Sequence, residues 1–441
     1  MVITDNFWKG RIAMKKLLPF LIAAVMFSFG SCAPIELNPE ALYEPPKLSQ
    51  EHREIYAAIE AKVGKDYILK YPESGEFRSA IVLRDIDLDN ADEAIVFYGR
   101  QDGENVRIIV LDKLNGQWKV TCDAAGYGTD IQQVVFEDIS GSRKPSIIVG
   151  FSQQNVTGNT MIVYEYKDSN LELEYIRDYS EFAVVDIDMD GTRDILVINN
   201  NYASNSAYAR VLKKNDGSIS EVGECYMNED VVGYLNIKAG IMATGSTAVY
   251  IDSLLASGSL MTEVLTVEYG DLVNKVYGMD NMLVEKTIRD RTLAFQDIND
   301  DGIFEIPTRE PLADSEGVYL TQWQQLYGVS LVPVLKTIDN NDAGYRIEIP
   351  ARWEGDIMVK NVIENNEWIF ATTGLKTNGV SYEVLSIRVY SDDDVIDQFA
   401  VKNYTLYAEK GMFKYYVSIP ELDNELAITE EEFKDMFKLI N

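Results

Sequence analysis

The stretch AVVDIDMDGTRDILVINNN, residues 183–201, places two apolar, β-branched runs on either side of a loop crowded with aspartates. Four of them fall within nine residues, at Asp186, Asp188, Asp190 and Asp194. Carboxylates this close repel one another, so the loop is either fully solvated or holds something positive. The apolar runs predict two short strands that this loop joins.

The same arrangement of apolar run, polar loop and second apolar run recurs along the chain. The loops begin at Asp85, Asp138, Asp186 and Asp297, with gaps of 53, 48 and 111 residues. Because 111 is close to two periods, a weakened copy is expected within residues 236–250. A period near 50 residues with several short strands per unit predicts a mainly β protein, a β-propeller of five or more blades. A β-sandwich is the rival architecture, which explains the alternation but not the period.

The segments between the loops supply the remaining strands of each unit. Asn115-Gly116 is a type I′ turn signal between two alternating runs, and a second hairpin is expected to turn around residues 167–170. No helical period is visible between about residues 78 and 335.

The aspartate loops have the residue types that a calcium ion needs. Side chains at positions 1, 3, 5 and 9 point inward with carboxylate or amide oxygens, position 7 offers its carbonyl, and glycine at position 6 allows the sharp turn. The glutamate at position 12 of an EF-hand is missing and the flanks are strands, so this is not an EF-hand. We expect structural Ca²⁺ in three loops, on Asp85, Asp87, Asp89 and Glu93; on Asp186, Asp188, Asp190 and Asp194; and on Asp297, Asn299, Asp301 and Glu305.

Two features of the loops limit this expectation. The loop at residues 138–146 has one carboxylate, with serines at the other ligand positions, so we expect it to be metal-free. Asn90 stands where the glycine belongs, which is a mild change because Asn tolerates a left-handed backbone. The alternative for every loop is a solvated hairpin turn in which Asp and Gly serve only the turn.

The pattern Asp-x-Asp-x-Asp-Gly-x-x-Asp between two strands resembles the FG-GAP repeat of integrin alpha subunits, also called a VCBS-type repeat. The resemblance covers about residues 78–325 and rests on these loops, because the Phe-Gly and Gly-Ala-Pro signatures are not visible. It implies an integrin-alpha-like β-propeller with calcium in its loops.

The N-terminal stretch MKKLLPFLIAAVMFSFGSC, residues 14–32, resembles a bacterial lipoprotein signal peptide. Two lysines precede an apolar segment, residues 17–29, that is too short for a comfortable membrane span. Small residues then lead to Cys32. We expect translation to start at Met14 and Cys32 to carry the lipid anchor. The alternative is a secretory signal with an incidental cysteine.

The rest of the chain divides into three parts by composition. Residues 33–47 are rich in proline and predict an extended tether. Residues 48–334 begin with a helix between Ser49 and Gly64 and continue as the propeller. Residues 335–441 change to an α+β pattern, which closes with a helix started by a capping box of Thr429 and Glu432.

Composition restricts the function. A formal charge of −31 disfavours nucleic acid and anionic membrane surfaces as partners, and a single histidine excludes multi-histidine metal sites. No catalytic motif is present, so no catalytic residue is assigned, although a carboxylate-pair hydrolase stays open. We expect an extracytoplasmic binding or scaffold lipoprotein of the bacterial cell envelope, with a protein or glycan ligand. The alternatives are a glycan-active enzyme or its accessory subunit, and an envelope-assembly factor.

Overall fold

The computed structural model describes residues 49–440 apart from 101–104, 154–157, 202–205, 278–281 and 392–403. The chain divides into two compact units, Met1–Ala57 and Ala58–Asn441. The signal region, Cys32 and the tether that the sequence predicts lie outside the described residues. Within the described part, no helix has the length and apolar character to cross a membrane.

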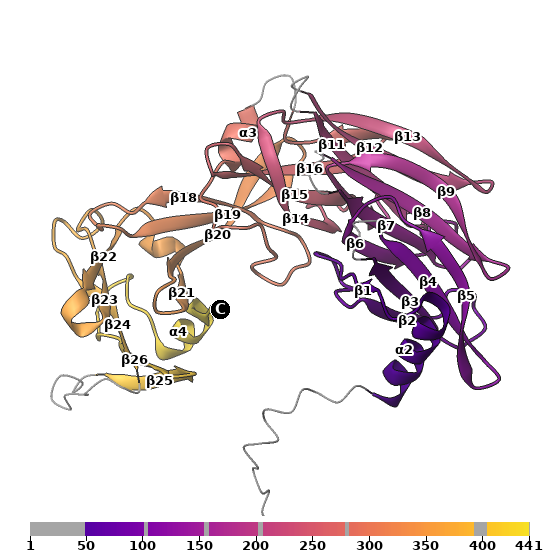
Figure 1. The fold of residues 1–441 in the computed structure, drawn as a ribbon. Helices are drawn as coiled ribbons and strands as arrows, with labels where there is room; N and C mark the ends of the chain where they lie inside the picture. The colour runs from indigo at the N-terminus through magenta and orange to yellow at the C-terminus, as the bar shows by residue number, and fades with distance from the viewer. Residues whose placement is uncertain are drawn as a thin grey trace, which may run out of the picture. The chain divides into compact units, whose positions relative to one another are not determined.

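The described chain is mainly β and forms antiparallel sheets of four or five strands (Figure 1). Each of the first four sheets uses one contiguous stretch of sequence. The first contains β1 (Ile68–Leu69), β2 (Ile81–Arg84), β3 (Glu93–Gly99), β4 (Arg107–Leu114) and β5 (Gln117–Ala125). The second runs β6 (Asp130–Glu137), β7 (Ser146–Ser152), β8 (Asn159–Lys167), β9 (Asn170–Tyr179).

The next two sheets follow the same order of neighbouring strands. The third runs β10 (Glu181–Val185), β11 (Asp194–Asn201), β12 (Ser206–Asn215), β13 (Ser218–Met227). The fourth runs β14 (Val231–Ile241), β15 (Thr247–Leu255), β16 (Leu260–Glu268), β17 (Asp271–Asn274). The weakened copy is the β14–β15 hairpin, whose turn lacks aspartates and closes with a bond from Met242 N–H to the Ser246 carbonyl at 2.8 Å.

The last two sheets contain the remaining strands. The fifth runs β18 (Ile306–Pro311), β19 (Tyr319–Tyr327), β20 (Ser330–Asn340), β21 (Tyr345–Glu348), β27 (Phe437–Leu439). The sixth runs β22 (Ile357–Val362), β23 (Glu367–Thr372), β24 (Glu383–Ser391), β26 (Phe413–Ser418), β25 (Thr405–Lys410). The expected division at residues 334 and 335 falls inside β20, which pairs with β19 on one side and β21 on the other.

Two-residue turns close the outer hairpins of these sheets, as the sequence predicts. Asn115 and Gly116 have φ of 54° and 76° and join β4 to β5. Asp168 and Ser169, with φ of 49° and 60°, join β8 to β9. Two successive left-handed residues match the twist of the flanking strands, which is why Asn, Asp and Gly occupy these places.

The strands after the first three loops, β3, β7 and β11, are buried on both faces. Along β7, Ile147 and Val149 join a core with the first sheet, whereas Ile148 joins a core with the third. Along β11 the faces alternate in the same way, with Ile195 toward the second sheet and Leu196 toward the fourth. Because successive side chains of a strand point to opposite faces, one apolar run serves two neighbouring cores. Consecutive sheets therefore share cores in the order of the sequence.

The helices are short and begin and end at recognisable residues. Helix α2 (Gln50–Val63) is capped by Ser49, whose hydroxyl accepts the His52 N–H at 3.1 Å, and it ends at Gly64 with φ of 85°. Helix α3 (Met282–Thr287) lies in a region without a visible helical period. Helix α4 (Glu430–Met436) has the predicted capping box of Thr429 and Glu432.

The sequence predicts a closing helix over residues 429–440, and the observed helix is shorter. After Met436 the chain becomes β27, and Phe437 pairs with Ile347 of β21. The Phe437 ring stacks on Tyr345 with centroids 5.8 Å apart and is buried. Burying this ring and completing the sheet edge outweigh one more turn of a short helix.

Candidate metal centre

The four polar loops fold on one hydrogen-bonding frame. We name them loop 1 (residues 85–93, between β2 and β3), loop 2 (138–146, between β6 and β7), loop 3 (186–194, between β10 and β11) and loop 4 (297–305, before β18). The carboxylate at position 1 accepts backbone N–H groups from the turn that follows it, so this residue organises the loop. Its bonds run from Leu88 and Asn90 to Asp85, from Asp190 and Gly191 to Asp186, from Asp301 and Gly302 to Asp297, and from Arg143 to Asp138.

Position 9 closes the frame in loops 1, 3 and 4. One oxygen of its carboxylate accepts the N–H of position 2, which ties the start of the second strand to the start of the loop. These bonds run from Ile86 to Glu93 Oε2 (2.9 Å), from Ile187 to Asp194 Oδ2 (3.2 Å) and from Ile298 to Glu305 Oε2 (2.9 Å). The other oxygen of position 9 faces the interior of the loop, and its surroundings differ from loop to loop.

Positions 4 and 6 have positive φ in all four loops. Position 6 is Gly191 (87°) in loop 3 and Gly302 (84°) in loop 4, whereas Asn90 has φ of 69° in loop 1. Asparagine therefore takes the left-handed backbone that the sequence assigns to this place. The side chains at positions 1, 3, 5 and 9 are held on one frame by turn chemistry that the sequence itself specifies.

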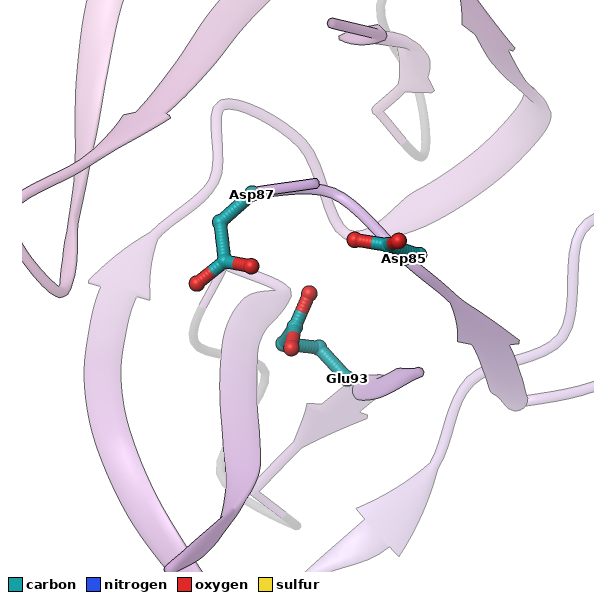
Figure 2. Close-up of side chains that lie close together, drawn as sticks. All are labelled: Asp85, Asp87 and Glu93. Carbon is teal, nitrogen blue, oxygen red and sulfur yellow. The ribbon is translucent and has the colours of Figure 1, made fainter. Parts of the chain in front are cut away.

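In loop 1 three of the four predicted ligands converge. Oxygens of Asp85, Asp87 and Glu93 lie within 4.8 Å of one another. Figure 2 shows their carboxylates turned toward a common space, with Asp85 and Asp87 on the loop and Glu93 at the start of β3. Asp89 is outside this group, and its Oδ1 accepts the Ala91 N–H at 2.7 Å.

Glu93 is the buried member of the loop 1 group. The residue is 0% exposed, and its Oε1 has no hydrogen-bond partner. Burial raises the pKa of the Glu93 carboxyl to about 7 against the lowering effect of the Ile86 N–H, and nearby Asp87 and Asp112 raise it further. Among the described residues, no lysine or arginine forms an ion pair with the predicted ligands of loop 1. Among the residues that the structure describes, no basic side chain therefore offsets the negative charge of this group.

Loop 3 gathers the equivalent group around a lysine. Oxygens of Asp186, Asp188 and Asp194 lie within 4.8 Å of one another. The Lys213 ammonium from β12 lies 2.9 Å from Asp188, 2.7 Å from Asp190 and 3.0 Å from Asp194. Its hydrogen bond lowers the pKa of Asp190. Burial would lower the pKa of Lys213, but its bonds to these aspartates hold it above the usual range. The chain itself supplies the positive charge here.

In loop 4 a side-chain amide occupies the position that the Lys213 ammonium has in loop 3. The side-chain Nε2 of Gln325, on β19, donates to Asp301 Oδ2 and to Glu305 Oε1, both at 2.7 Å. Asn299 Nδ2 donates to Asp301 at 3.0 Å. No three acidic side chains of this loop bring oxygens within 4.8 Å of one another, as those of loops 1 and 3 do.

Loop 2 keeps the frame with hydroxyl groups. Ser140 Oγ donates to Asp138 at 3.0 Å and lies 2.8 Å from Ser142 Oγ, whose hydroxyl can donate to it, and the residue at position 9, Ser146, is buried. The Lys144 ammonium bonds the Tyr166 carbonyl of β8, outside the loop. The carboxylate and the serine hydroxyls of loop 2 therefore form hydrogen bonds with one another and with the loop backbone.

The residues that distinguish the loops were not singled out from the sequence. They lie on β4, β8, β12 and β19. We call each of these the third strand, counting the chain segment before the loop as the first and the strand after the loop as the second. They come 19 or 20 residues after position 9 and are Asp112, Glu165, Lys213 and Gln325. A charged or polar residue at this constant spacing is the signal that would have found them. It becomes meaningful only when the pairing of second and third strands is known.

A pocket of about 350 Å³ lies elsewhere, lined by residues of β6, β10 and β14. Two glutamates, Glu137 and Glu181, are among them. Burial raises the pKa of Glu181, whose Oε1 accepts from Gln133 Nε2 at 3.3 Å and from the Phe182 N–H at 3.0 Å. Glu137 approaches Arg193 at 4.0 Å. This acidic pair is separate from the predicted metal ligands.

Known proteins offer little guidance. No protein-family model and no curated protein matches the sequence. Structures that align with it include the Bacillus licheniformis rhamnogalacturonan lyase PL11, at 12% identity, covering 69% of this chain and 74% of that one with a TM-score of 0.32. The exotype rhamnogalacturonan lyase YesX aligns at 9% identity, covering 73% and 83% with a TM-score of 0.32, and rhamnogalacturonan lyase YesW at 10%, covering 72% and 83% with 0.30. No function for this chain follows from them.

Proposed function

We propose that this protein is an extracytoplasmic binding or scaffold lipoprotein, with calcium-stabilised loops on a β-propeller of five or more blades. The observation that carries the proposal is the repeated loop. One frame recurs in the first, second and third sheets and before the fifth, and in loop 1 three carboxylates converge while Glu93 Oε1 has no hydrogen-bond partner. The blades provide a rigid base, and the ligand is a protein or a glycan.

The propeller is supported by how the sheets follow one another. The first four sheets use contiguous stretches of four or five strands in sequence order, and neighbouring sheets share hydrophobic cores. Phe295 and Ile306 join Tyr250 in a core that links the fourth and fifth sheets. Blades of a propeller pack in this sequential way around an axis.

Loop 1 fits a calcium ion by its own chemistry. Three carboxylates converge, and the buried Oε1 of Glu93 lacks the partner that a buried oxygen needs. Asp85, Asp87, Asp89 and Glu93 would hold the ion, which would offset their mutual repulsion and tie β2 to β3. Loop 4 is the second proposed site, because rotating the Gln325 amide would turn its oxygen toward Asp301 and Glu305.

Calcium should raise the melting temperature of the full-length chain, and a chelator should lower it. An ion that binds only the folded state stabilises it by about 2.7 kcal/mol at about 100 times the dissociation constant. The change Asp87→Ala should remove one bound ion, counted by native mass spectrometry. Ser140→Ala in loop 2 is the matched control and should leave the count unchanged. Identical melting with and without chelator, and no bound ion, would leave the loops as solvated turns.

Lipidation at Cys32 should decide where the protein resides. The lysines and the short apolar segment before Cys32 motivate this prediction. In membrane fractionation of the producing bacterium, Cys32→Ala should move the protein to the soluble fraction, because two acyl chains supply the anchoring. The change Cys122→Ala is the control for loss of a thiol and should leave the protein in the membrane. Retention of Cys32→Ala in membranes would contradict the lipoprotein proposal.

A glycan-active enzyme is the second candidate, because the pocket beside β6, β10 and β14 holds Glu137 and Glu181. Acid–base hydrolysis of glycosides uses a pair of carboxyl groups, one of them with a raised pKa. A glycan array and a pull-down with the full-length protein, with and without Ca²⁺, separate the candidates. Bound, unchanged glycan or a captured protein supports the binding function, whereas turnover favours the enzyme. A stable envelope-protein partner would favour the assembly-factor alternative.

A further inference from the structure

One residue on the third strand faces position 9 of each loop. The pairs Ala94 with Leu111 and Ile195 with Leu212 fix the register of the second and third strands. One step further along the same ladders, Glu93 lies opposite Asp112 and Asp194 lies opposite Lys213. The same step in the other two sheets places Ser146 opposite Glu165 and Glu305 opposite Gln325.

We propose that this third-strand residue decides which loops take a divalent cation. Asp112 leaves loop 1 open to an ion, whereas the Lys213 ammonium serves loop 3 as a built-in cation and excludes a metal there. The proposal rests on the proposed calcium site of loop 1, and it revises the expectation that loops 1 and 3 bind ions alike.

The position of the Lys213 ammonium supports its role as a substitute ion. Its nitrogen is within 3.0 Å of the carboxylates at positions 3, 5 and 9, Asp188, Asp190 and Asp194, which are three of the four ligands predicted for calcium. Calcium needs these oxygens at about 2.3–2.6 Å, so the ammonium and the ion compete for one space. Only 17% of the lysine side chain is exposed. If Ca²⁺ displaced the Lys213 ammonium, the two positive charges would lie side by side in a half-buried site, which is unfavourable.

Loop 1 presents the opposite situation on the same frame. The third-strand residue is an acid, Asp112, which adds a fifth carboxylate to Asp85, Asp87, Asp89 and Glu93. In loop 3 the second oxygen of position 9, Asp194 Oδ1, accepts no hydrogen bond but lies 3.0 Å from the Lys213 ammonium, whereas in loop 1 the equivalent Glu93 Oε1 has neither a hydrogen bond nor an ion pair among the described residues. Because a buried carboxylate is stable only when it is protonated, paired or coordinated, a cation from solution would stabilise the ionised form of loop 1.

The test changes Lys213 and Asp112 in the full-length protein and counts bound Ca²⁺ by native mass spectrometry. Lys213→Met should add one ion, because it frees the ligands of loop 3. It should melt lower than wild type in chelator and regain stability when Ca²⁺ is added. Asp112→Lys should remove one ion, since its ammonium can reach the loop 1 carboxylates. Lys275→Met is the control, because Lys275 pairs with Glu268 outside the loops and its loss should not alter the count.

A third variant tests loop 3 without removing its lysine. Asp188→Asn in the wild-type background should leave the number of bound ions unchanged. Loss of an ion from Asp188→Asn would show that wild-type loop 3 already binds metal, and an unchanged count in Lys213→Met would show that the lysine does not exclude it; either result overturns the inference. If the wild type binds no ion while Lys213→Met binds one, the loop 1 site fails and the role of Lys213 stands.

Discussion

Replacing Arg289 by methionine should lower the free energy of unfolding by about 3–5 kcal/mol, because it leaves a buried carboxylate without its cation. The side chains of Arg289 and Asp252 are both 0% exposed and meet at 2.5 Å. Asp252 also accepts the Thr262 hydroxyl at 2.7 Å and the Phe295 N–H at 3.1 Å. Arg289 thus connects β15 to the segment that leads into loop 4.

Chemical denaturation of the full-length protein measures this loss. The double variant Arg289→Met with Asp252→Asn should recover part of it, because both charges are then removed. Lys438→Met is the matched control: Lys438 lies 3.9 Å from Glu348 with half of its side chain exposed, so the loss should stay below about 1 kcal/mol. An Arg289→Met protein as stable as this control would show that the buried pair contributes little.

Replacing Glu263 by glutamine should stabilise the protein above neutral pH by about 3 kcal/mol. Glu263 is fully buried on β16. Its carboxyl accepts hydrogen bonds from the Asn228 N–H at 2.9 Å, from Asn274 Nδ2 at 2.9 Å and from the Ser253 hydroxyl at 3.0 Å. Burial raises the pKa of its carboxyl from 4.5 to about 7, although these donors act to lower it. The fold therefore favours the neutral form, which glutamine imitates.

The sign of the pH dependence follows from where the proton is held. Between about pH 4.5 and 7 the folded state keeps the Glu263 proton and the unfolded chain releases it, so rising pH lowers the stability of the wild type. Above pH 7 both states are ionised and the loss is constant. The difference in stability between Glu263→Gln and wild type should grow across this window, measured by denaturation at several pH values.

An exposed glutamate supplies the control for this measurement. The Glu172 side chain on β9 is exposed to solvent, so Glu172→Gln should give no comparable growth. A difference for Glu263→Gln that stays flat from pH 4.5 to 8 would contradict a buried neutral carboxyl.

Local chemistry made much of the β structure predictable. The alternating runs, the two-residue turns at Asn115 and Asp168, and the capping box at Thr429 all depend on neighbours in sequence. The chain end was not predictable in this way, because the pairing of Phe437 with β21 depends on residues about 90 positions away. The short helix α3 likewise gives no periodic signal of its own.

The sequence by itself determined the four loops, because their frame consists of hydrogen bonds that backbone N–H groups donate to aspartates at most a few residues away. It placed the predicted ligands of each loop on one turn. What it did not determine is the charge that meets them, since Asp112, Lys213 and Gln325 come from a strand whose register is set by sheet pairing. Only the tertiary structure decided that loop 1 faces an acid and loop 3 a lysine, because contact across a sheet depends on register and not on spacing along the chain.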